Sequence, residues 1–387
     1  MLVPAVVATR SAQSQTFTVL HSFTGGTDGA SPIAGLVRDA AGNLYGTTDL
    51  GGPSNSGTLF KVDATGKETV LYNFTGGADG GYLTTGLIRA AGNLYGTTRQ
   101  GGSSGNGAVY LLDKKGKQTV LYSFTGKTDG ASPSSGLIRD AAGDLYGTTS
   151  GGGAMTDCYG YGCGVVFKLD ITGKETVLYS FTGGADGTDP ETGVTRDAKG
   201  NLYGTTSGGG DLTCNAPYGC GVVFLLDATG KETVLYSFTG GTDGGMPSSG
   251  LIRDGSGNLY GSAVFGGAQQ RGVVFKINKK GKQSVLYNFT GGTDGGYPWG
   301  GVIRDSSGNL YGTSNTGGEM ADCYGSGCGV VFKLDPLGNL TVLHSFIAGA
   351  DGAYPYAGLV RDTAGNLYGT ANYGGSGYVG TVFEITP

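Results

Sequence analysis

Two acidic side chains in one turn, Asp189 and Glu191, are the strongest candidates in this sequence for acid–base chemistry. A pair of carboxyl groups can supply the general acid and the base or nucleophile that glycan cleavage requires. The variable segments offer no His as a partner, and two acids in one turn are a weak pattern. We therefore expect a protein that is not an enzyme. The alternative is a glycan-active hydrolase or lyase that uses these carboxylates.

Aromatic side chains gather around a proline that recurs along the chain. The only Trp, Trp299, follows Pro298 in "GGYPWGG", where most corresponding segments carry small, polar or aliphatic residues. Exposed aromatic rings bind sugars or proteins at a low cost in conformational entropy. It also remains open that these rings only cover the ends of the repeats. We predict a ligand or partner surface made of Tyr82, Asp189, Glu191, Tyr297, Trp299, Tyr354 and Tyr356.

Six cysteines form three local pairs, each inside a Gly-rich segment. An even number at repeated spacing predicts disulfides and an oxidising compartment. Zinc would need four ligands, whereas each segment offers two and no His, so we predict no metal site. Pairing between neighbouring repeats remains possible. The predicted disulfide cysteines are Cys158, Cys163, Cys214, Cys220, Cys323 and Cys328.

These residues must be positioned by a repeated scaffold. The word "LYG" occurs seven times, from Leu44 to Leu367, at intervals of 50 to 57 residues, and the three longest intervals hold the cysteine pairs. Each repeat has four runs with strand-like alternation, which in the first repeat are expected at 35–39, 43–48, 57–63 and 68–74. Four short antiparallel strands in about 50 residues are typical of a propeller blade.

The two ends of the chain complement each other. The last repeat stops after its third run (380–387), and the chain begins with an isolated fourth run (16–23). Joined, they complete one blade and leave no open edge. We therefore predict an all-β fold: a seven-bladed β-propeller with four antiparallel strands per blade, closed by the N-terminal strand, over residues 16–387. An open solenoid is the alternative.

The repeated words "GNLYGTT", "GVVFKLD" and "LYSFTGG" resemble the GloVer tandem repeat of exported bacterial proteins, and the resemblance extends from Thr16 to the end of the chain. Proteins with this repeat are described as choice-of-anchor proteins. The resemblance implies export and a secreted, extracellular or cell-surface location. It implies no catalytic residue.

Polar residues that recur in every repeat are expected to serve the scaffold. An Arg ends each first run, an Asp occupies each "DG" turn before the next blade, and His21 and His344 replace a Tyr of the fourth run. A guanidinium tied to neighbouring carboxylates between blades is the simplest role for the Arg. The Asp suits a tight turn, with calcium as the alternative ligand.

Charge and hydropathy exclude two classes of partner. The formal net charge of −5 and the lack of a basic stripe argue against nucleic acid, and no apolar run is long enough for membrane insertion. Residues 1–15 are predicted to be the remnant of a signal peptide or an N-terminal tail, through which the protein would form a homo-oligomer or filament.

The function that follows is an exported, rigid recognition or assembly module without a cofactor. In a propeller the connections between strands two and three and those between blades emerge on one face, so the variable segments should share a surface. We expect a protein or a glycan to bind there. A lectin-like glycan-binding protein is the alternative.

Overall fold

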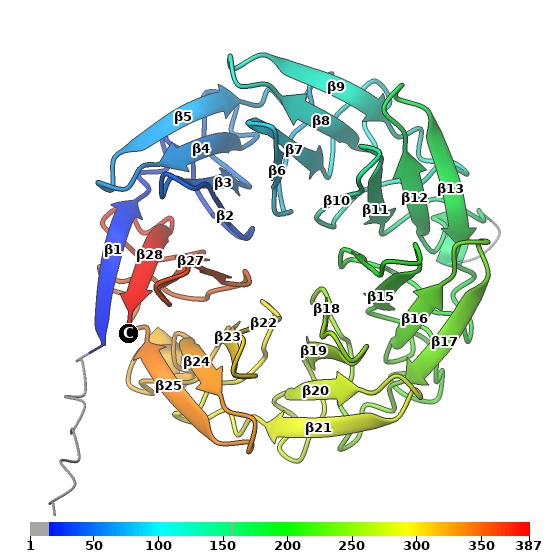
Figure 1. Ribbon diagram of the computed structural model, residues 1–387. Helices are drawn as coiled ribbons and strands as arrows, with labels where there is room; N and C mark the ends of the chain where they lie inside the picture. Colours follow the sequence, from blue (N-terminus) through cyan, green and yellow to red (C-terminus); the bar gives the residue numbers. More distant parts are fainter. Residues whose placement is uncertain (1–14, 156–157) are drawn as a thin grey trace, which may run out of the picture.

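The computed structural model describes residues 15–155 and 158–387 and arranges them as seven four-stranded antiparallel sheets around a central channel (Figure 1). Each sheet is one blade, with its first strand nearest the channel and its fourth strand outermost. The predicted seven-bladed β-propeller is confirmed. The predicted N-terminal segment, residues 1–15, lies outside the described residues except for residue 15.

The blades are numbered in chain order. Blades 1 to 3 are β2 (Val37–Arg38), β3 (Leu44–Thr48), β4 (Thr58–Val62) and β5 (Glu68–Asn73); β6 (Ile88–Ala90), β7 (Asn93–Thr98), β8 (Ala108–Leu112) and β9 (Gln118–Ser123); β10 (Ile138–Arg139), β11 (Leu145–Thr149), β12 (Val165–Leu169) and β13 (Glu175–Ser180). Blades 4 to 6 are β14 (Thr195–Arg196), β15 (Leu202–Thr206), β16 (Val222–Leu226) and β17 (Glu232–Ser237); β18 (Ile252–Arg253), β19 (Leu259–Ala263), β20 (Val273–Ile277) and β21 (Gln283–Asn288); β22 (Val302–Arg304), β23 (Leu310–Ser314), β24 (Val330–Leu334) and β25 (Leu340–Ser345). Blade 7 is β26 (Val360–Arg361), β27 (Leu367–Ala371), β28 (Thr381–Thr386) and β1 (Thr16–Ser22), and two short helices are η1 (Cys158–Gly160) and η2 (Cys323–Gly325).

The hydrophobic core is divided into layers between neighbouring blades. Val166 and Phe181 of blade 3 pack with Leu202 and Phe224 of blade 4, and the two Phe rings meet edge to face with centroids 5.2 Å apart. Third strands therefore bury side chains on both faces, as the pattern of β12 shows. This double burial explains why runs such as "VVFKL" are almost continuously apolar and not strictly alternating.

The innermost strands are shorter than predicted. The run expected at 35–39 forms a ladder only over Val37–Arg38. The chain just before each inner strand lies against the neighbouring blade: a Cβ added to Gly193 would come within 2.8 Å of the carbonyl oxygen of Gly136. Because the blades converge at the channel, this segment packs between blades and does not extend the sheet.

The N-terminal strand closes the ring. β1 pairs with β28 from Thr16↔Thr386 to Ser22↔Thr381, and Figure 1 shows the two strands side by side. The open solenoid is therefore excluded.

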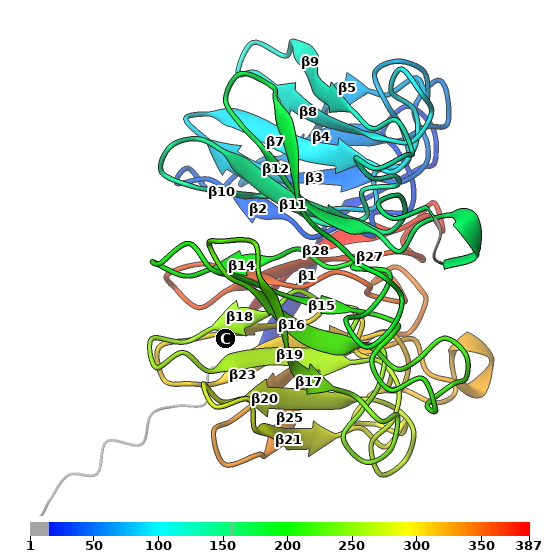
Figure 2. The ribbon, with the colours of Figure 1, turned by 90° about the vertical axis from the view of Figure 1, so that its right-hand side faces the viewer.

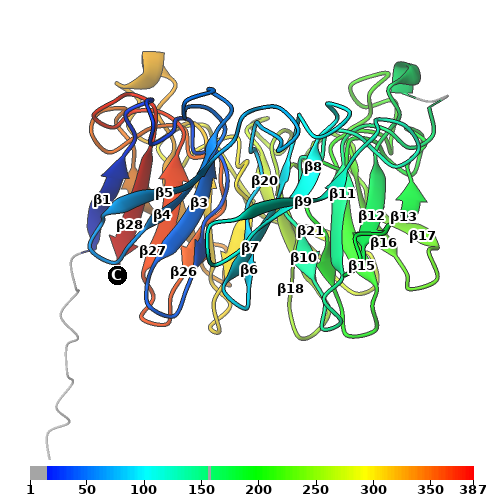
Figure 3. The same cartoon turned by 90° about the horizontal axis from the view of Figure 1, so that it is seen from above.

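Two views along the edge of the ring separate its faces (Figures 2 and 3). The connections between second and third strands and the connections between blades emerge on one face, together with η1 and η2, while short hairpin turns occupy the other. We call the first of these the loop face. Its existence confirms that the variable segments share a surface.

Three disulfides brace the loop face as local pairs, Cys158–Cys163, Cys214–Cys220 and Cys323–Cys328, with Cα atoms 5.4, 5.6 and 5.3 Å apart. Pairing between neighbouring repeats is excluded. Three disulfides indicate an exported protein. None of the described segments forms a helix long and apolar enough to cross a membrane.

The repeated Arg side chains join neighbouring blades. Arg196 of blade 4 lies over the ring of Tyr146 in blade 3, with 5.5 Å between the guanidinium carbon and the ring centroid, and its Nη2 atom is 3.8 Å from Asp140. Tyr146 donates a hydrogen bond of 3.0 Å to the same carboxylate. The structural role expected for this ring of cations is confirmed.

The repeated Asp of the turns between blades binds the turn itself. Asp186 accepts hydrogen bonds from the backbone N–H and hydroxyl of Thr182 and from the hydroxyl of Tyr179. His344 takes the place of this Tyr, with Nε2 at 3.0 Å from Asp351. The two His therefore serve the same position in the blade as the tyrosines they replace.

Candidate functional site

One cavity of about 430 Å³ opens at the loop-face end of the central channel. The residue that follows the repeated proline, or follows Leu83 where blade 2 lacks the proline, lines it in every blade, so seven segments converge on one site. In blade order these residues are Ile33, Thr84, Ser134, Glu191, Ser248, Trp299 and Tyr356. Three residues of the predicted surface, Glu191, Trp299 and Tyr356, are among them. We call this cavity the channel mouth.

The backbone of each segment is held between two blades. Tyr297, two residues before Trp299, has a left-handed φ of 54°. Its N–H donates to the carbonyl of Arg271 in the preceding blade, and its own carbonyl accepts from the N–H of Asn315 behind β23. Pro298 fixes its own φ, and the N–H of Trp299 donates to the carbonyl of Tyr297 over 3.0 Å, so the indole is carried on a segment with little freedom.

A second set of lining residues was not predicted from the sequence. Asp49, Arg99 and Asn372 come directly after the second strands β3, β7 and β27. The signal was present, because this position changes from blade to blade behind the nearly constant "LYGTT". The residues there are Asp49, Arg99, Ser150, Ser207, Val264, Asn315 and Asn372.

The wall of the channel mouth has two unlike arcs. Trp299, Tyr356 and Ile33 come from the consecutive blades 6, 7 and 1, and the first two rings lie 6.1 Å apart at 54°. The remaining residues at this position, in blades 2 to 5, are Thr84, Ser134, Glu191 and Ser248. One side therefore offers aromatic faces and the other offers hydroxyl and carboxyl groups.

Several polar atoms of this wall are buried without a hydrogen-bond partner among the described residues. They are Oδ1 of Asp49, Oγ1 of Thr84, Oγ of Ser134 and Oδ1 of Asn372. A buried polar atom that makes no hydrogen bond is costly. Such atoms are therefore suited to exchange hydrogen bonds with a polar molecule in the cavity.

Three charged groups set the electrostatics of the channel mouth. Burial raises the pKa of Asp49, and Arg99 opposes that rise. The pKa of Glu191 is raised by burial first and by the Asp189 carboxylate second, again against Arg99. Solvent still reaches Glu191, so burial here means the crowding of the channel walls around its carboxylate. Both acids hold a proton more readily than they would in water.

The other predicted surface residues lie outside the channel mouth. Tyr297 is held by Arg271, whose guanidinium carbon lies 5.2 Å from the ring centroid, and by Phe265, with ring centroids 5.5 Å apart. Tyr354 is half-buried against the core, and burial raises the pKa of its hydroxyl. Tyr82 is also half-buried, with a φ of 59°.

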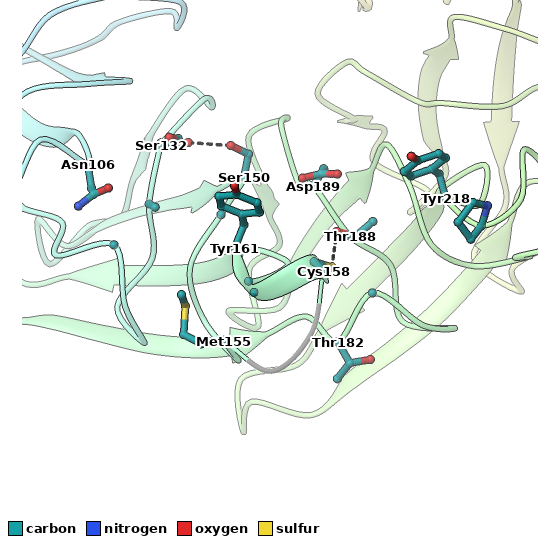
Figure 4. Close-up of a pocket in the computed structure, with 17 residues that line it drawn as sticks. Asn106, Ser132, Ser150, Met155, Cys158, Tyr161, Thr182, Thr188, Asp189 and Tyr218 are labelled. Carbon is teal, nitrogen blue, oxygen red and sulfur yellow. Dashed lines mark hydrogen bonds between the residues drawn. The ribbon is translucent and has the colours of Figure 1, made fainter.

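Asp189 lines a second hollow, of about 690 Å³, between the disulfide loops of blades 3 and 4. Figure 4 shows Asp189 there with Tyr161 and Tyr218, whose side chains are largely exposed. The two acids considered for catalysis therefore border different cavities. The acid that shares the channel mouth with Glu191 is Asp49.

Among solved structures, the fold is similar to a candidate 6-phosphogluconolactonase from Bacteroides uniformis, with a TM-score of 0.51, 17% identity, and coverage of 81% of this chain and 84% of the other. It is also similar to the extracellular domain of a one-component system from B. thetaiotaomicron, with a TM-score of 0.54, 10% identity, and coverage of 90% and 37%. A gluconolactonase from Xanthomonas campestris has a TM-score of 0.44 at 15% identity, with coverage of 76% and 82%. Comparison with curated protein sequences gives no match.

The prediction that the protein is not an enzyme is contradicted by these comparisons, because a propeller named as a candidate 6-phosphogluconolactonase shares the fold. The prediction depended on the absence of a His among the variable segments and overlooked Asp49, which only folding brings into the same cavity as Glu191 and Arg99. At these identities the likeness shows a shared fold and not a shared activity.

The Gloeobacter/Verrucomicrobia repeat matches residues 5–216 and 212–387, which together span almost the whole sequence. The chain therefore belongs to the Gloeobacter/Verrucomicrobia repeat family.

Proposed function

We propose that this protein is an exported propeller that binds a carbohydrate at the channel mouth. Trp299 and Tyr356 would stack on the apolar face of a sugar ring. Thr84, Ser134 and Asp49 would exchange hydrogen bonds with its hydroxyl groups. The cavity of about 430 Å³ is of the size that small-molecule sites use.

One observation carries this proposal: an aromatic arc faces a polar arc, and four buried polar atoms of the wall, those of Thr84 and Ser134 in the polar arc and of Asp49 and Asn372 beside it, have no hydrogen-bond partner among the described residues. A sugar has the same two-sided chemistry, with C–H groups on its ring faces and hydroxyl groups at its edges. A purely apolar ligand would leave the oxygen atoms of Asp49, Thr84 and Ser134 unbonded, which the cost of buried polar groups disfavours.

The binding test is a glycan array followed by calorimetry with the strongest binder. Aromatic stacking contributes about 1 kcal/mol, so Trp299→Ala should weaken binding about fivefold at equal folding. Tyr324→Ala is the matched control, because this loop-face tyrosine is fully exposed and does not line the cavity. Equal losses in both variants, or no binding to any glycan, would contradict the proposal.

A second candidate function is hydrolysis of the bound carbohydrate. Asp49 and Glu191 are two acids of one cavity; a raised pKa suits one of them to act as the general acid, and the other would serve as the base or nucleophile. Asp49→Asn or Glu191→Gln would then abolish turnover of the identified ligand while binding remains measurable. If wild-type protein releases no product from any ligand it binds, this second function fails and the binding function stands.

A further inference from the structure

The first residue of the outer strand is tied to the turn through which the chain enters the same blade. In blade 2, the side-chain amide of Gln118 donates to the carbonyl oxygen of Asp79 over 3.2 Å. In blade 5, Gln283 makes the same bond to Asp243 over 3.1 Å. Each bond joins the start of an outer strand to a turn that follows the outer strand of the preceding blade, and so links two blades at the rim of the ring.

Three blades carry Glu at this position. Glu68, Glu175 and Glu232 begin β5, β13 and β17, and all three side chains are partly buried. In each, Oε1 is buried and has no hydrogen-bond partner among the described residues. The facing turns carry Asp28, Asp129 and Asp186, the equivalents of the aspartates that face Gln118 and Gln283.

Glutamine and glutamic acid have nearly the same shape, but only some of their forms can donate a hydrogen bond. A carboxylate is an acceptor only, whereas a protonated carboxyl group donates through its O–H. We propose that Glu68, Glu175 and Glu232 are protonation-dependent hydrogen-bond donors, which make the propeller more stable in mildly acidic than in alkaline surroundings.

The groups around these side chains support a retained proton. Burial first, and the Asp28 carboxylate second, raise the pKa of Glu68 to about 7. Glu175 and Glu232 are raised to about 7 by burial and by their own aspartates. The charged group that shifts each of these pKa values is the facing aspartate, and it raises the value.

The ionisable groups of the neighbouring outer strands complete these surroundings. Near Glu68, His21 of β1 in blade 7 lies 3.6 Å from Asp28, and burial lowers the pKa of this His despite that carboxylate. Near Glu175 and Glu232, Tyr122 of blade 2 and Tyr179 of blade 3 donate hydrogen bonds from their hydroxyl groups to Asp129 and Asp186. Tyrosine stays neutral in this pH range, so it adds no charge that would favour the carboxylates.

The direction of the pH dependence follows from proton binding. An unfolded chain releases these protons near the ordinary Glu value of 4.5, and the folded ring releases them near 7. Between the two values the folded state binds more protons, so the free energy of unfolding falls as the pH rises, and the loss is complete above the folded pKa. At low pH the stabilisation is present in full.

The test compares the wild-type protein with the triple variant Glu68→Gln, Glu175→Gln and Glu232→Gln. Gln already occupies this position in two blades, so the variant is expected to fold. The wild-type Tm should fall by at least about 2–4 °C from about pH 5 to about pH 8, and the triple variant should lose at least half of that fall. The pKa values of Asp49, Asp189 and Glu191 are also raised, and these acids are present in both proteins. The contribution of Glu68, Glu175 and Glu232 is therefore the difference in pH dependence between wild type and variant.

Two further measurements make the outcome decisive. Infrared spectra at about pH 6 should contain a protonated carboxyl band that is weaker in the triple variant, since a folded pKa near 7 keeps Glu68, Glu175 and Glu232 protonated there. Gln118→Glu with Gln283→Glu should steepen the pH dependence, whereas Glu319→Gln, an exposed loop residue, should leave it unchanged. The proposal is overturned if the triple variant keeps the wild-type pH dependence or if its infrared band is as intense as that of the wild type. Neither result bears on ligand binding at the channel mouth.

Discussion

The hydroxyl of Thr370 donates a hydrogen bond of 3.2 Å to the carbonyl oxygen of Ala34, although 336 residues separate them along the chain. The bond runs from the second strand of blade 7 to the segment that enters blade 1, at the seam where the ring closes. The same link recurs around the channel, as from Thr47 to Thr85 and from Thr313 to Ala357. The wall of the channel is thus a ring of bonds between blades, and it supports the residues of the channel mouth.

We expect Thr370→Val to weaken this seam. The substitution keeps the shape of the side chain and leaves the carbonyl of Ala34 without this donor, which costs about 1–3 kcal/mol for a buried group. Urea unfolding should show a lower midpoint with an unchanged slope. Thr229→Val, which removes only an exposed turn bond to Asp227, is the control and should shift the midpoint much less. Equal midpoints for wild type and Thr370→Val would show that the seam does not depend on this bond.

Removal of β1 should be far more damaging than removal of the residues before it. A chain that begins at residue 15 keeps the pairing of β1 with β28, whereas a chain that begins at residue 24 leaves β28 as an open edge. We expect the first to unfold cooperatively and the second to aggregate. Size-exclusion chromatography and thermal unfolding distinguish them. A monomeric, cooperatively folded chain from residue 24 would mean that closure is dispensable.

The disulfides should order the loop face without determining global stability. A bridge that closes a ring of about six residues removes unfolded-state entropy worth about 2 kcal/mol. Replacing Cys323 and Cys328 by Ala should make the segment between them more sensitive to proteolysis and lower the Tm only slightly. Mass spectrometry of limited digests locates the cuts. Cleavage throughout the blades at the same rate would instead indicate that the bridge supports the whole ring.

Trp299 should report on the channel mouth by its own fluorescence, because it is the only Trp in the chain. A carbohydrate stacked on the indole displaces water, so emission should shift to shorter wavelength and acrylamide should quench it less. Tyr356→Ala should reduce both effects, since this ring lies 6.1 Å from the indole. A glycan that binds in calorimetry without changing the emission would bind elsewhere on the protein.

Much of the architecture could be predicted before folding was considered. The spacing of "LYG", the four alternating runs per repeat and the complementary ends predict seven blades and their closure, since period and alternation are local properties of the chain. Local disulfides followed from the closeness of each pair, such as Cys158 and Cys163. The aromatic side of the site could also be predicted, because the other repeats have no Trp at the position of Trp299.

Only the tertiary structure decided which side chains share a cavity. Asp49, Arg99 and Glu191 come from three blades, and no spacing in the chain places them around one channel. Asp189 and Glu191 stand two residues apart, yet they border different hollows, with Asp189 held at a left-handed φ of 53°. The repeated sequence determines the structure of each blade, because nearly the same contacts recur in all seven blades. The site depends on where the blades differ, and those differences meet only after the ring has closed.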